Sequence, residues 1–177
     1  MKNAISKLRN YQGEKFNDQV ADLFEQNSNL ITKRRIKKIG KLKISGEKGE
    51  LGDIDVLVAN PKTKVLQVIE CKNYGQAKIA HEMANEMEEL FLVRLKKDGK
   101  SRKKSAVAKH QERVNWINNH LSEVLTWLGL EVSTSSWKVQ SLLVTDSELP
   151  TPHMYKSPIP VTSFIELSKK INLVSNQ

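Results

Sequence analysis

Apolar residues recur along this chain at two spacings, one typical of helices and one typical of strands. Over residues 13–26 the apolar side chains follow the spacing of an amphipathic helix: Phe16, Val20, Leu23 and Phe24. The same spacing predicts a second helix over residues 79–91 and a long third helix over residues 107–128, which Gly129 is placed to terminate. The pattern thus predicts helices in both halves of the chain.

Shorter runs rich in β-branched residues predict strands. Residues 52–58 and 65–72 are two such runs, and the Asn60-Pro61-Lys62-Thr63 segment between them is a turn sequence. We therefore expect the two runs to pair as a β-hairpin. Residues 137–145 predict a further strand, and residues 31–44 predict an extended segment with many basic side chains.

A last helix is expected after a proline-rich loop, where Ser163 and Glu166 form a capping box. The predicted order is then a helix, several strands, two helices, a strand and a helix. This order indicates an α/β fold in which a central mixed β-sheet is flanked by α-helices. With 177 residues, 38% of them hydrophobic, the chain is long enough for one well-buried core, so residues 1–177 are expected to form a single domain.

The chain is strongly basic, with 29 Lys and Arg residues against 20 Asp and Glu residues and a formal net charge of +9. Such a surplus favours a polyanionic partner, and nucleic acid is the first candidate. The single cysteine, Cys71, excludes an intrachain disulfide and a cysteine-cluster zinc site, which fits a reducing compartment. The start of the chain lacks the apolar run of a signal peptide, and no run of about 20 apolar residues is present. A cytoplasmic protein that does not insert into a membrane is therefore expected.

Three groups of basic residues are candidates for contact with nucleic-acid phosphates, which position a duplex without reading its sequence. They lie in the extended basic segment, in a basic run over residues 96–104 that is expected to be a flexible loop, and near the start of the third helix. Their members are Lys33, Arg34, Arg35, Lys37, Lys100, Arg102, Lys103, Lys104, Lys109 and Arg113. The alternative for each basic run, and for His110 and Arg113 on the helix, is a solvated charged surface.

Acidic and basic residues converge on the predicted hairpin. Because side chains alternate faces along a strand, Glu70 and Lys72 point the same way while Cys71 points to the other face. Two charged residues within an apolar strand need compensation for their desolvation, which a bound metal ion and an anionic substrate would provide. On the preceding strand, Asp55 is the favoured metal ligand because it sits deeper in the apolar run. Asp53 is the alternative, since alternation places it on the same face.

The series Asp55 and then Glu70-Cys71-Lys72, with Glu70 following 15 residues after Asp55, resembles the PD-(D/E)XK nuclease superfamily. Ile54 stands where the named motif has proline. The resemblance implies a restriction-endonuclease-like core, and it implies a further carboxylate from the first helix, a position that Glu14 matches. The Gly-Asp-Ile-Asp and Glu-Cys-Lys-Asn segments are most similar to the Mrr-like and nuclease-related-domain branches. For Glu14, the alternative is a first-turn acid that favours the helix dipole.

Phosphodiester hydrolysis gives each of these residues a chemical role. Asp55 and Glu70 are suited to holding Mg²⁺, for which Mn²⁺ would substitute, with the Cys71 backbone carbonyl and Glu14 as further ligands. Lys72 is expected to have a depressed pKa and to orient or deprotonate the attacking water, or to stabilise the transition state in its charged form. The alternative is a lysine that pairs with Glu70 at a sheet edge. Gln76 either assists at the site or is a turn residue.

The sequence therefore predicts a metal-dependent endonuclease that hydrolyses DNA in restriction, defence or repair. The runner-up is a catalytically inactive nucleic-acid-binding module of the same fold within a larger assembly. A third interpretation is a protein-interaction domain that uses the acidic face of the second helix. Double-stranded DNA is the expected partner by resemblance. The sequence leaves open the choice between DNA and RNA, a homodimer or partner domain, and a longer parent protein.

Overall fold

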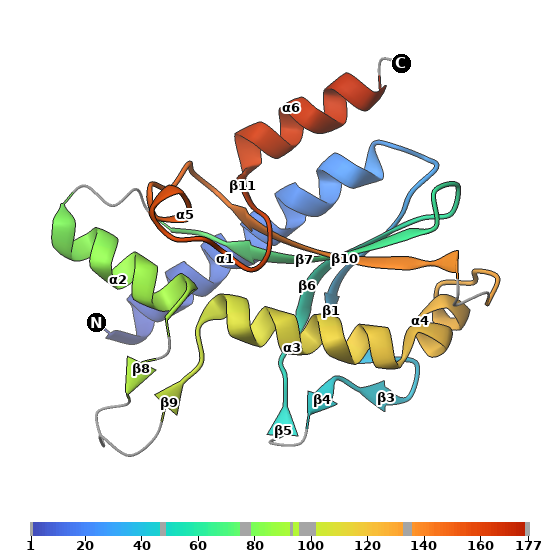
Figure 1. Cartoon of the computed structure of the whole chain (residues 1–177), viewed down its shortest axis with the longest axis horizontal. Helices are drawn as coiled ribbons and strands as arrows, with labels where there is room; N and C mark the ends of the chain where they lie inside the picture. Colours follow the sequence, from blue (N-terminus) through green and yellow to red (C-terminus); the bar gives the residue numbers. More distant parts are fainter. Residues whose placement is uncertain are drawn as a thin grey trace.

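The computed structural model describes residues 2–46, 49–74, 79–92, 94–95, 102–132 and 136–175 (Figure 1). The helices are α1 (Lys2–Glu25), α2 (Ala80–Leu90), α3 (Ala106–Asn119), α4 (Leu121–Trp127), α5 (Thr151–Met154) and α6 (Phe164–Ser175). The strands are β1 (Ile31–Ile36), β2 (Lys38–Ile39), β3 (Leu42–Lys43), β4 (Ser45–Gly46), β5 (Gly49–Glu50), β6 (Ile54–Asn60), β7 (Val65–Lys72), β8 (Arg94–Leu95), β9 (Arg102–Lys103), β10 (Lys138–Thr145) and β11 (Val161–Ser163).

A five-stranded mixed sheet with strand order β1-β6-β7-β10-β11 forms the centre of the molecule. The predicted hairpin is present as the antiparallel pair β6–β7, and β1 adds antiparallel to β6. On the other side of β7, β10 and β11 are parallel to their neighbours. Three short ribbons, β2–β3, β4–β5 and β8–β9, stand apart from this sheet. The mixed central sheet flanked by helices is therefore confirmed.

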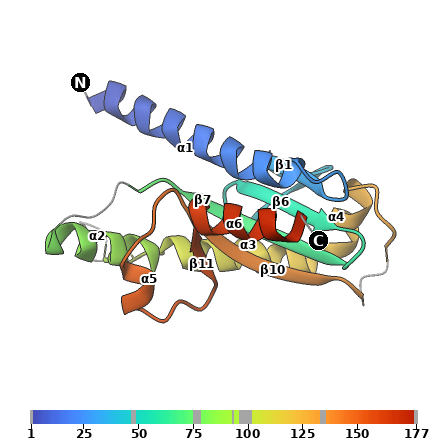
Figure 2. The ribbon, with the colours of Figure 1, turned by 90° about the horizontal axis from the view of Figure 1, so that it is seen from above.

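Helices cover both faces of the sheet. Helices α1 and α6 lie on one face, where Phe16, Val20 and Leu167 pack against Val56 and Ile69 (Figures 1 and 2). Helices α3 and α4 lie on the other face, where the core contains Leu57, Leu66, Val68, Ile117 and Leu125. Because both faces are covered, β6 and β7 are buried along most of their length, which explains their nearly continuous apolar sequences.

Helix α1 begins much earlier than the apolar spacing predicts. It starts at Lys2, and its N-terminal half extends beyond the sheet, as Figure 2 shows. Leu8 and Tyr11 are exposed there, so these two apolar residues do not indicate a buried face. Glu14 therefore lies in the middle of the helix, and its interpretation as a first-turn acid is wrong.

The predicted third helix is two helices that meet at His120, so the single long helix was wrong. His120 has φ −120° and ψ 30°, outside the helical region. Its ring stacks on Trp116 at 4.2 Å between centroids, and its Nδ1 lies 2.9 Å from the Trp116 carbonyl oxygen. This side chain thus competes for a helical carbonyl and favours the break. Gly129 follows α4 with φ 72°, the left-handed conformation expected after a helix end.

Of two other local predictions, one is confirmed and one is wrong in part. The capping box is confirmed, because Glu166 N–H donates to Ser163 Oγ at 3.3 Å and Ser163 N–H donates to Glu166 Oε2 at 3.5 Å. The flexible loop over residues 96–104 is wrong at its end, where β9 pairs with β8. Residues 96–101 lie outside the described part of the chain.

None of the described helices combines the length and apolar character needed to cross a membrane.

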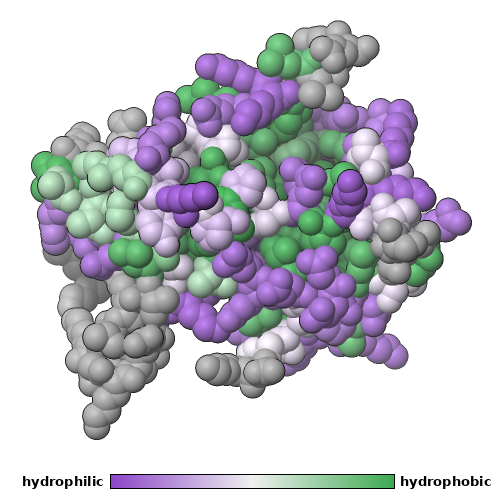
Figure 3. All heavy atoms as spheres, viewed as in Figure 1, coloured by the Kyte–Doolittle hydropathy of each residue, from purple (hydrophilic) through white to green (hydrophobic). Residues whose placement is uncertain are grey.

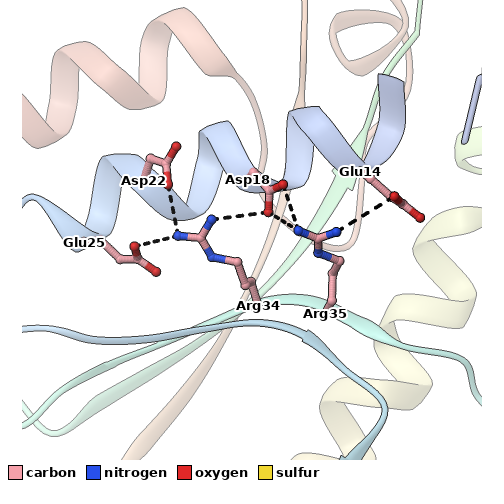
Figure 4. A network of polar contacts seen from close by, with 6 residues as sticks. All are labelled: Glu14, Asp18, Asp22, Glu25, Arg34 and Arg35. Atoms are coloured by element: carbon pink, nitrogen blue, oxygen red, sulfur yellow. Dashed lines mark hydrogen bonds and ion pairs between the residues drawn. The ribbon is translucent and has the colours of Figure 1, made fainter. Parts of the chain in front are cut away.

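A network of ion pairs fastens α1 to β1 (Figure 4). Arg34 lies 3.3 Å from Asp18, 3.0 Å from Asp22 and 2.5 Å from Glu25. The neighbouring Arg35 lies 2.5 Å from the same Asp18. The acidic side chains of one helix face therefore neutralise much of the basic charge on this strand.

Replacing Arg34 with alanine is expected to lower the free energy of unfolding by about 1 kcal/mol, because three partly exposed ion pairs are lost together. Equilibrium urea unfolding would measure the change, and added salt should reduce it. The matched control is Lys33→Ala, since Lys33 lies on the same strand and, within the described residues, makes a cation–π contact of 6.0 Å with Trp127 in place of an ion pair. Equal destabilisation by both variants would contradict the importance of the network.

Candidate functional site

Glu70 is the centre of the candidate site. This residue is 2% exposed in the middle of the sheet, on the face covered by α3. Lys72 Nζ lies 2.7 Å from its Oε1 atom, and Arg113 donates a hydrogen bond to Oε2. Arg113 is itself held by a second hydrogen bond, in which Nε donates to the Leu51 carbonyl at 2.9 Å. Two cations from different elements therefore compensate one buried carboxylate.

His110 completes the surroundings of Glu70. Its Nδ1 lies 3.8 Å from Glu70 Oε2, and the imidazole is 1% exposed. Neither ring nitrogen makes a hydrogen bond of normal geometry within the described residues. Burial lowers the pKa of His110 to about 4, although Glu70 and, to a smaller extent, the Val68 backbone oppose this shift. His110 is therefore neutral at pH 7, and the interpretation of His110 and Arg113 as a solvated helical face was wrong.

Asp55 reaches the same region from β6. The β6–β7 ladder ends at the pair Val56 and Ile69, and beyond it the Cys71 N–H donates to Asp55 Oδ2 at 2.8 Å. Burial and the nearby Glu70 charge raise the pKa of Asp55 to about 6, against the effect of the Cys71 hydrogen bond. Cys71 itself points to the opposite core, as alternation predicted.

A local irregularity in β1 and β6 accompanies the placement of Asp55. In β1, Arg35 has a positive φ of 51°, and the register passes from the pair Arg34–Val56 to the pair Ile36–Ile54. Ile54 then packs in the same core as Leu57, while Val56 packs in the other. Strict alternation is thus broken at Asp55 without an inserted residue, because one residue separates the two pairs on each strand.

Asp53 does not join this group. It lies before β6, its side chain is 44% exposed, and its carboxylate is 3.9 Å from Lys37 Nζ. Because alternation is broken at Asp55, the expectation that Asp53 and Asp55 share a strand face does not hold. Between the two acids, the structure places Asp55 beside Glu70.

The electrostatics of Glu70 and Lys72 favour charged forms. Burial acts to raise the pKa of Glu70, but Lys72 and Arg113 together lower it below the usual range. Burial also acts to lower the pKa of Lys72, but Glu70 and then Asp55 hold it above its usual value. The expected depressed pKa of Lys72 is therefore wrong for the metal-free protein, because two carboxylates outweigh desolvation.

A pocket of about 350 Å³ opens beside Glu70 and Lys72. Side chains from the end of β7, the end of α2, β9 and the start of α3 surround it. Its lining residues are Glu70, Lys72, Tyr74, Glu88, Glu89, Leu92, Lys103, Lys104, Ala106, Lys109 and Arg113. Asp55 is not part of the lining. Hydrophilic side chains cover much of the face drawn in Figure 3, with smaller apolar areas between them.

Glu14 lies on the helix that covers the opposite face of the sheet. Its side chain is 62% exposed and its carboxylate is 3.9 Å from Arg35 Nη1 (Figure 4). The structure therefore does not bring Glu14 together with Glu70 and Lys72. The helix backbone does approach the end of β7, where Asn73 Nδ2 donates to the Gln12 carbonyl at 3.5 Å.

The predicted phosphate contacts have different surroundings. Arg34 and Arg35 are paired with α1, Lys37 lies 3.9 Å from Asp53, and Lys33 lies over Trp127. Of the remaining basic residues, Lys103, Lys104, Lys109 and Arg113 line the pocket. Lys100, the side chain of Arg102 and the predicted site residue Gln76 lie outside the described part of the structure.

Sequence reasoning missed that His110 and Arg113 contact the buried carboxylate. A signal was present, because His110 lies three residues from Val107 and seven from Ile117, within the buried stripe of the helix. Polar residues at such positions indicate a buried partner. The partner itself, Glu70, becomes visible only when α3 packs on the sheet.

The site contains oxygen donors of the type that a hard divalent cation prefers. The Asp55 and Glu70 carboxylates and the Cys71 carbonyl are ligands of the kind that Mg²⁺ prefers. The raised pKa of Asp55 is the supporting observation, because a cation between two neighbouring buried carboxylates would relieve their repulsion. Arg113 competes for one of these positions. In the described part of the chain, no group of three or more His, Cys, Asp or Glu side chains is arranged to hold a metal.

Replacing Asp55 with asparagine is expected to stabilise the metal-free protein by about 2 kcal/mol near neutral pH. The pKa of Asp55 rises from 3.8 to about 6 on folding, so its stabilising contribution is complete below pH 3.8 and is lost as pH rises through 6. Asparagine keeps an acceptor for the Cys71 N–H but carries no charge. Urea unfolding in EDTA should therefore show a gain at about pH 7.5 that disappears at about pH 4. Asp53→Asn is the control, and a pH-independent difference for Asp55→Asn would contradict the assignment.

Comparison with known proteins yields no match to this chain, whether among protein-family models, curated protein sequences or solved structures.

Proposed function

We propose that this protein is a metal-dependent nuclease with a restriction-endonuclease-like core, and that it hydrolyses phosphodiester bonds in DNA. The observation that carries the proposal is the meeting of Asp55, Glu70 and Lys72 at the adjoining ends of β6 and β7. Glu70 and Lys72 also line a pocket with three further lysines. Carboxylates for a metal ion, a lysine beside them and cations around them are the components that phosphodiester hydrolysis requires.

The two carboxylates and the Cys71 carbonyl would hold Mg²⁺ or Mn²⁺. When bound, the ion supplies Lewis-acid polarisation of a phosphoryl oxygen and a water of lowered pKa. Lys72 is protonated near neutral pH because of its carboxylate neighbours, so it acts as a fixed positive charge that stabilises the developing negative charge. Arg113 holds Glu70 in place in the metal-free protein. His110 is neutral and lies buried beside Glu70.

A cleavage assay tests this proposal. The purified chain is incubated with supercoiled plasmid, linear duplex and single-stranded DNA, each with Mg²⁺, Mn²⁺ or EDTA. We expect cleavage that requires the metal and that Glu70→Gln abolishes, because this variant keeps the side-chain volume but loses the charge. Cleavage that persists in EDTA, or that Glu70→Gln leaves unchanged, would reject the proposal. Parallel RNA substrates establish which nucleic acid is cut.

One observation favours a second candidate, a nucleic-acid-binding module of the same fold that does not cleave. Both oxygens of Glu70 already have protein cations as partners, namely Lys72 and Arg113. Such a module would bind nucleic acid with a strong salt dependence and without Mg²⁺. Affinity that is equal in Mg²⁺ and EDTA, together with no cleavage of any substrate, would select this candidate over the nuclease.

A further inference from the structure

Lys103 and Lys109 are unusual among the cations of the pocket because they have no carboxylate partner within the described residues. The other basic residues of the lining are paired: Lys72 with Glu70, Arg113 with Glu70, and Lys104 with Glu112. Lys103 comes from β9 and Lys109 from the first half of α3, so two separate elements direct unpaired ammonium groups to one pocket.

The position of Lys109 links this cation to the candidate site. It precedes Arg113 by four residues in α3, a spacing that places both side chains on neighbouring turns of one helix face. Both line the pocket with Glu70 and Lys72. The Lys109 ammonium is therefore adjacent to the proposed reaction centre, whereas Lys104 is held towards Glu112.

Lys109 lies among several other positive charges. Burial lowers the pKa of Lys109, and the positive charges of Lys103, Lys72 and Arg113 lower it further, while Glu70 acts in the opposite direction. The lining also contains Glu70, Glu88 and Glu89, but its five cations outnumber these three carboxylates, and like charges near one another raise the free energy of the unbound protein. A bound anion would remove this penalty, and charge-assisted contacts to phosphate oxygens are among the strongest that lysine makes.

We propose that Lys103 and Lys109 bind one phosphate of a nucleic-acid strand, next to the phosphate that lies at Glu70 and Lys72. The position of the neighbouring phosphate rests on the proposed function, but the binding itself does not require cleavage. This subsite distinguishes Lys103 and Lys109 from the basic residues of β1, which are paired with α1. The strand thus enters along β9 and the start of α3.

Binding in EDTA tests the subsite without cleavage. The dissociation constant of a short labelled DNA strand is measured over a range of salt concentrations for the wild type, Lys103→Ala, Lys109→Ala and the double variant. Each single variant is expected to weaken binding about fivefold, and the double variant should reduce the slope of log K against log salt by about 0.7, the value for one single-strand phosphate contact. The matched controls are Lys62→Ala, in the β6–β7 turn, and Lys169→Ala, on α6, both exposed and away from the pocket.

A second measurement uses the wild-type protein. Lysine side chains are labelled with an amine-selective reagent, with and without the DNA strand, and their modification is quantified by mass spectrometry. We expect the strand to protect Lys103 and Lys109 but not Lys62 or Lys169. Unchanged affinity and salt slope in the double variant, or protection of the four lysines to the same extent, would overturn the subsite. Either result is independent of the cleavage assay, so loss of the subsite and loss of the nuclease proposal are distinguishable.

Discussion

Cleavage by the Lys72→Ala variant is expected to be about 100- to 10,000-fold slower than cleavage by the wild type. Lys72 Nζ lies 2.7 Å from Glu70 Oε1, at the edge of the pocket where a phosphate would sit. The Glu70 and Asp55 carboxylates keep the lysine charged, so alanine removes a positive charge from the reaction centre. Initial rates of plasmid nicking at saturating Mg²⁺ measure this loss.

Two controls separate this effect from a general loss of structure. Lys72→Arg retains the positive charge and should lose less activity than Lys72→Ala, although the guanidinium geometry differs. Lys62→Ala changes a lysine at the other end of the same hairpin and should leave the rate unchanged. Circular dichroism and the urea midpoint establish that each variant is folded. A Lys72→Ala rate equal to that of wild type would exclude Lys72 from the chemistry.

Replacing Arg113 with alanine is expected to lower the free energy of unfolding by about 3 to 5 kcal/mol in EDTA at neutral pH. The variant leaves the Glu70 carboxylate buried with one cation fewer, and it also removes the hydrogen bond from Arg113 Nε to the Leu51 carbonyl. Urea unfolding measures the loss. If the site holds a divalent cation, millimolar Mg²⁺ should restore part of this stability, because a ligand that binds only the folded state stabilises it.

The control for Arg113 removes both partners of the ion pair. The double variant Glu70→Gln with Arg113→Met lacks both the Glu70 charge and the Arg113 charge, so it should be more stable than Arg113→Ala alone. Mg²⁺ should have no effect on this double variant. Stabilisation of Arg113→Ala by Mg²⁺ would support the nuclease, whereas indifference to Mg²⁺ would favour the non-cleaving module. A loss below about 1 kcal/mol would show that water already reaches Glu70.

The elements that pack by a simple repeat were predictable from sequence. Phe16, Val20 and Phe24 indicate the buried part of α1, and the apolar strands on either side of Pro61 indicate the hairpin. Glu70 and Lys72 were also predictable as neighbours, because their stretch of β7 is regular and alternation holds there. Local spacing carries this information without any knowledge of the rest of the fold.

Other features depend on contacts that no local spacing records. The break in alternation at Asp55 lies opposite Arg35, a residue with positive φ about twenty positions earlier in the chain. Arg113 was interpreted as a solvated surface residue because it is charged, although its position belongs to the buried stripe of the helix. The break at His120 depends on a side chain that binds its own helix. Glu14 belongs to a helix that starts at Lys2, well before the buried residue Phe16, so its place along that helix was not predictable.

The parallel pairing of β7 with β10 has a consequence for the order in which the molecule folds. The β6–β7 hairpin joins Asp55 to Cys71 across a four-residue turn, so these groups can meet early. Arg113 reaches Glu70 only when α3 docks, and β10 pairs with β7 only after the long intervening segment has closed. We therefore expect Asp55 and Glu70 to come together while water still surrounds their carboxylates. The water would leave in the later, slower step, when α3 and β10 pack against the hairpin. Folding kinetics of variants would test this order. The ratio of the change in folding activation free energy to the change in stability, the folding φ-value, should be near zero at Arg113 and higher in the hairpin.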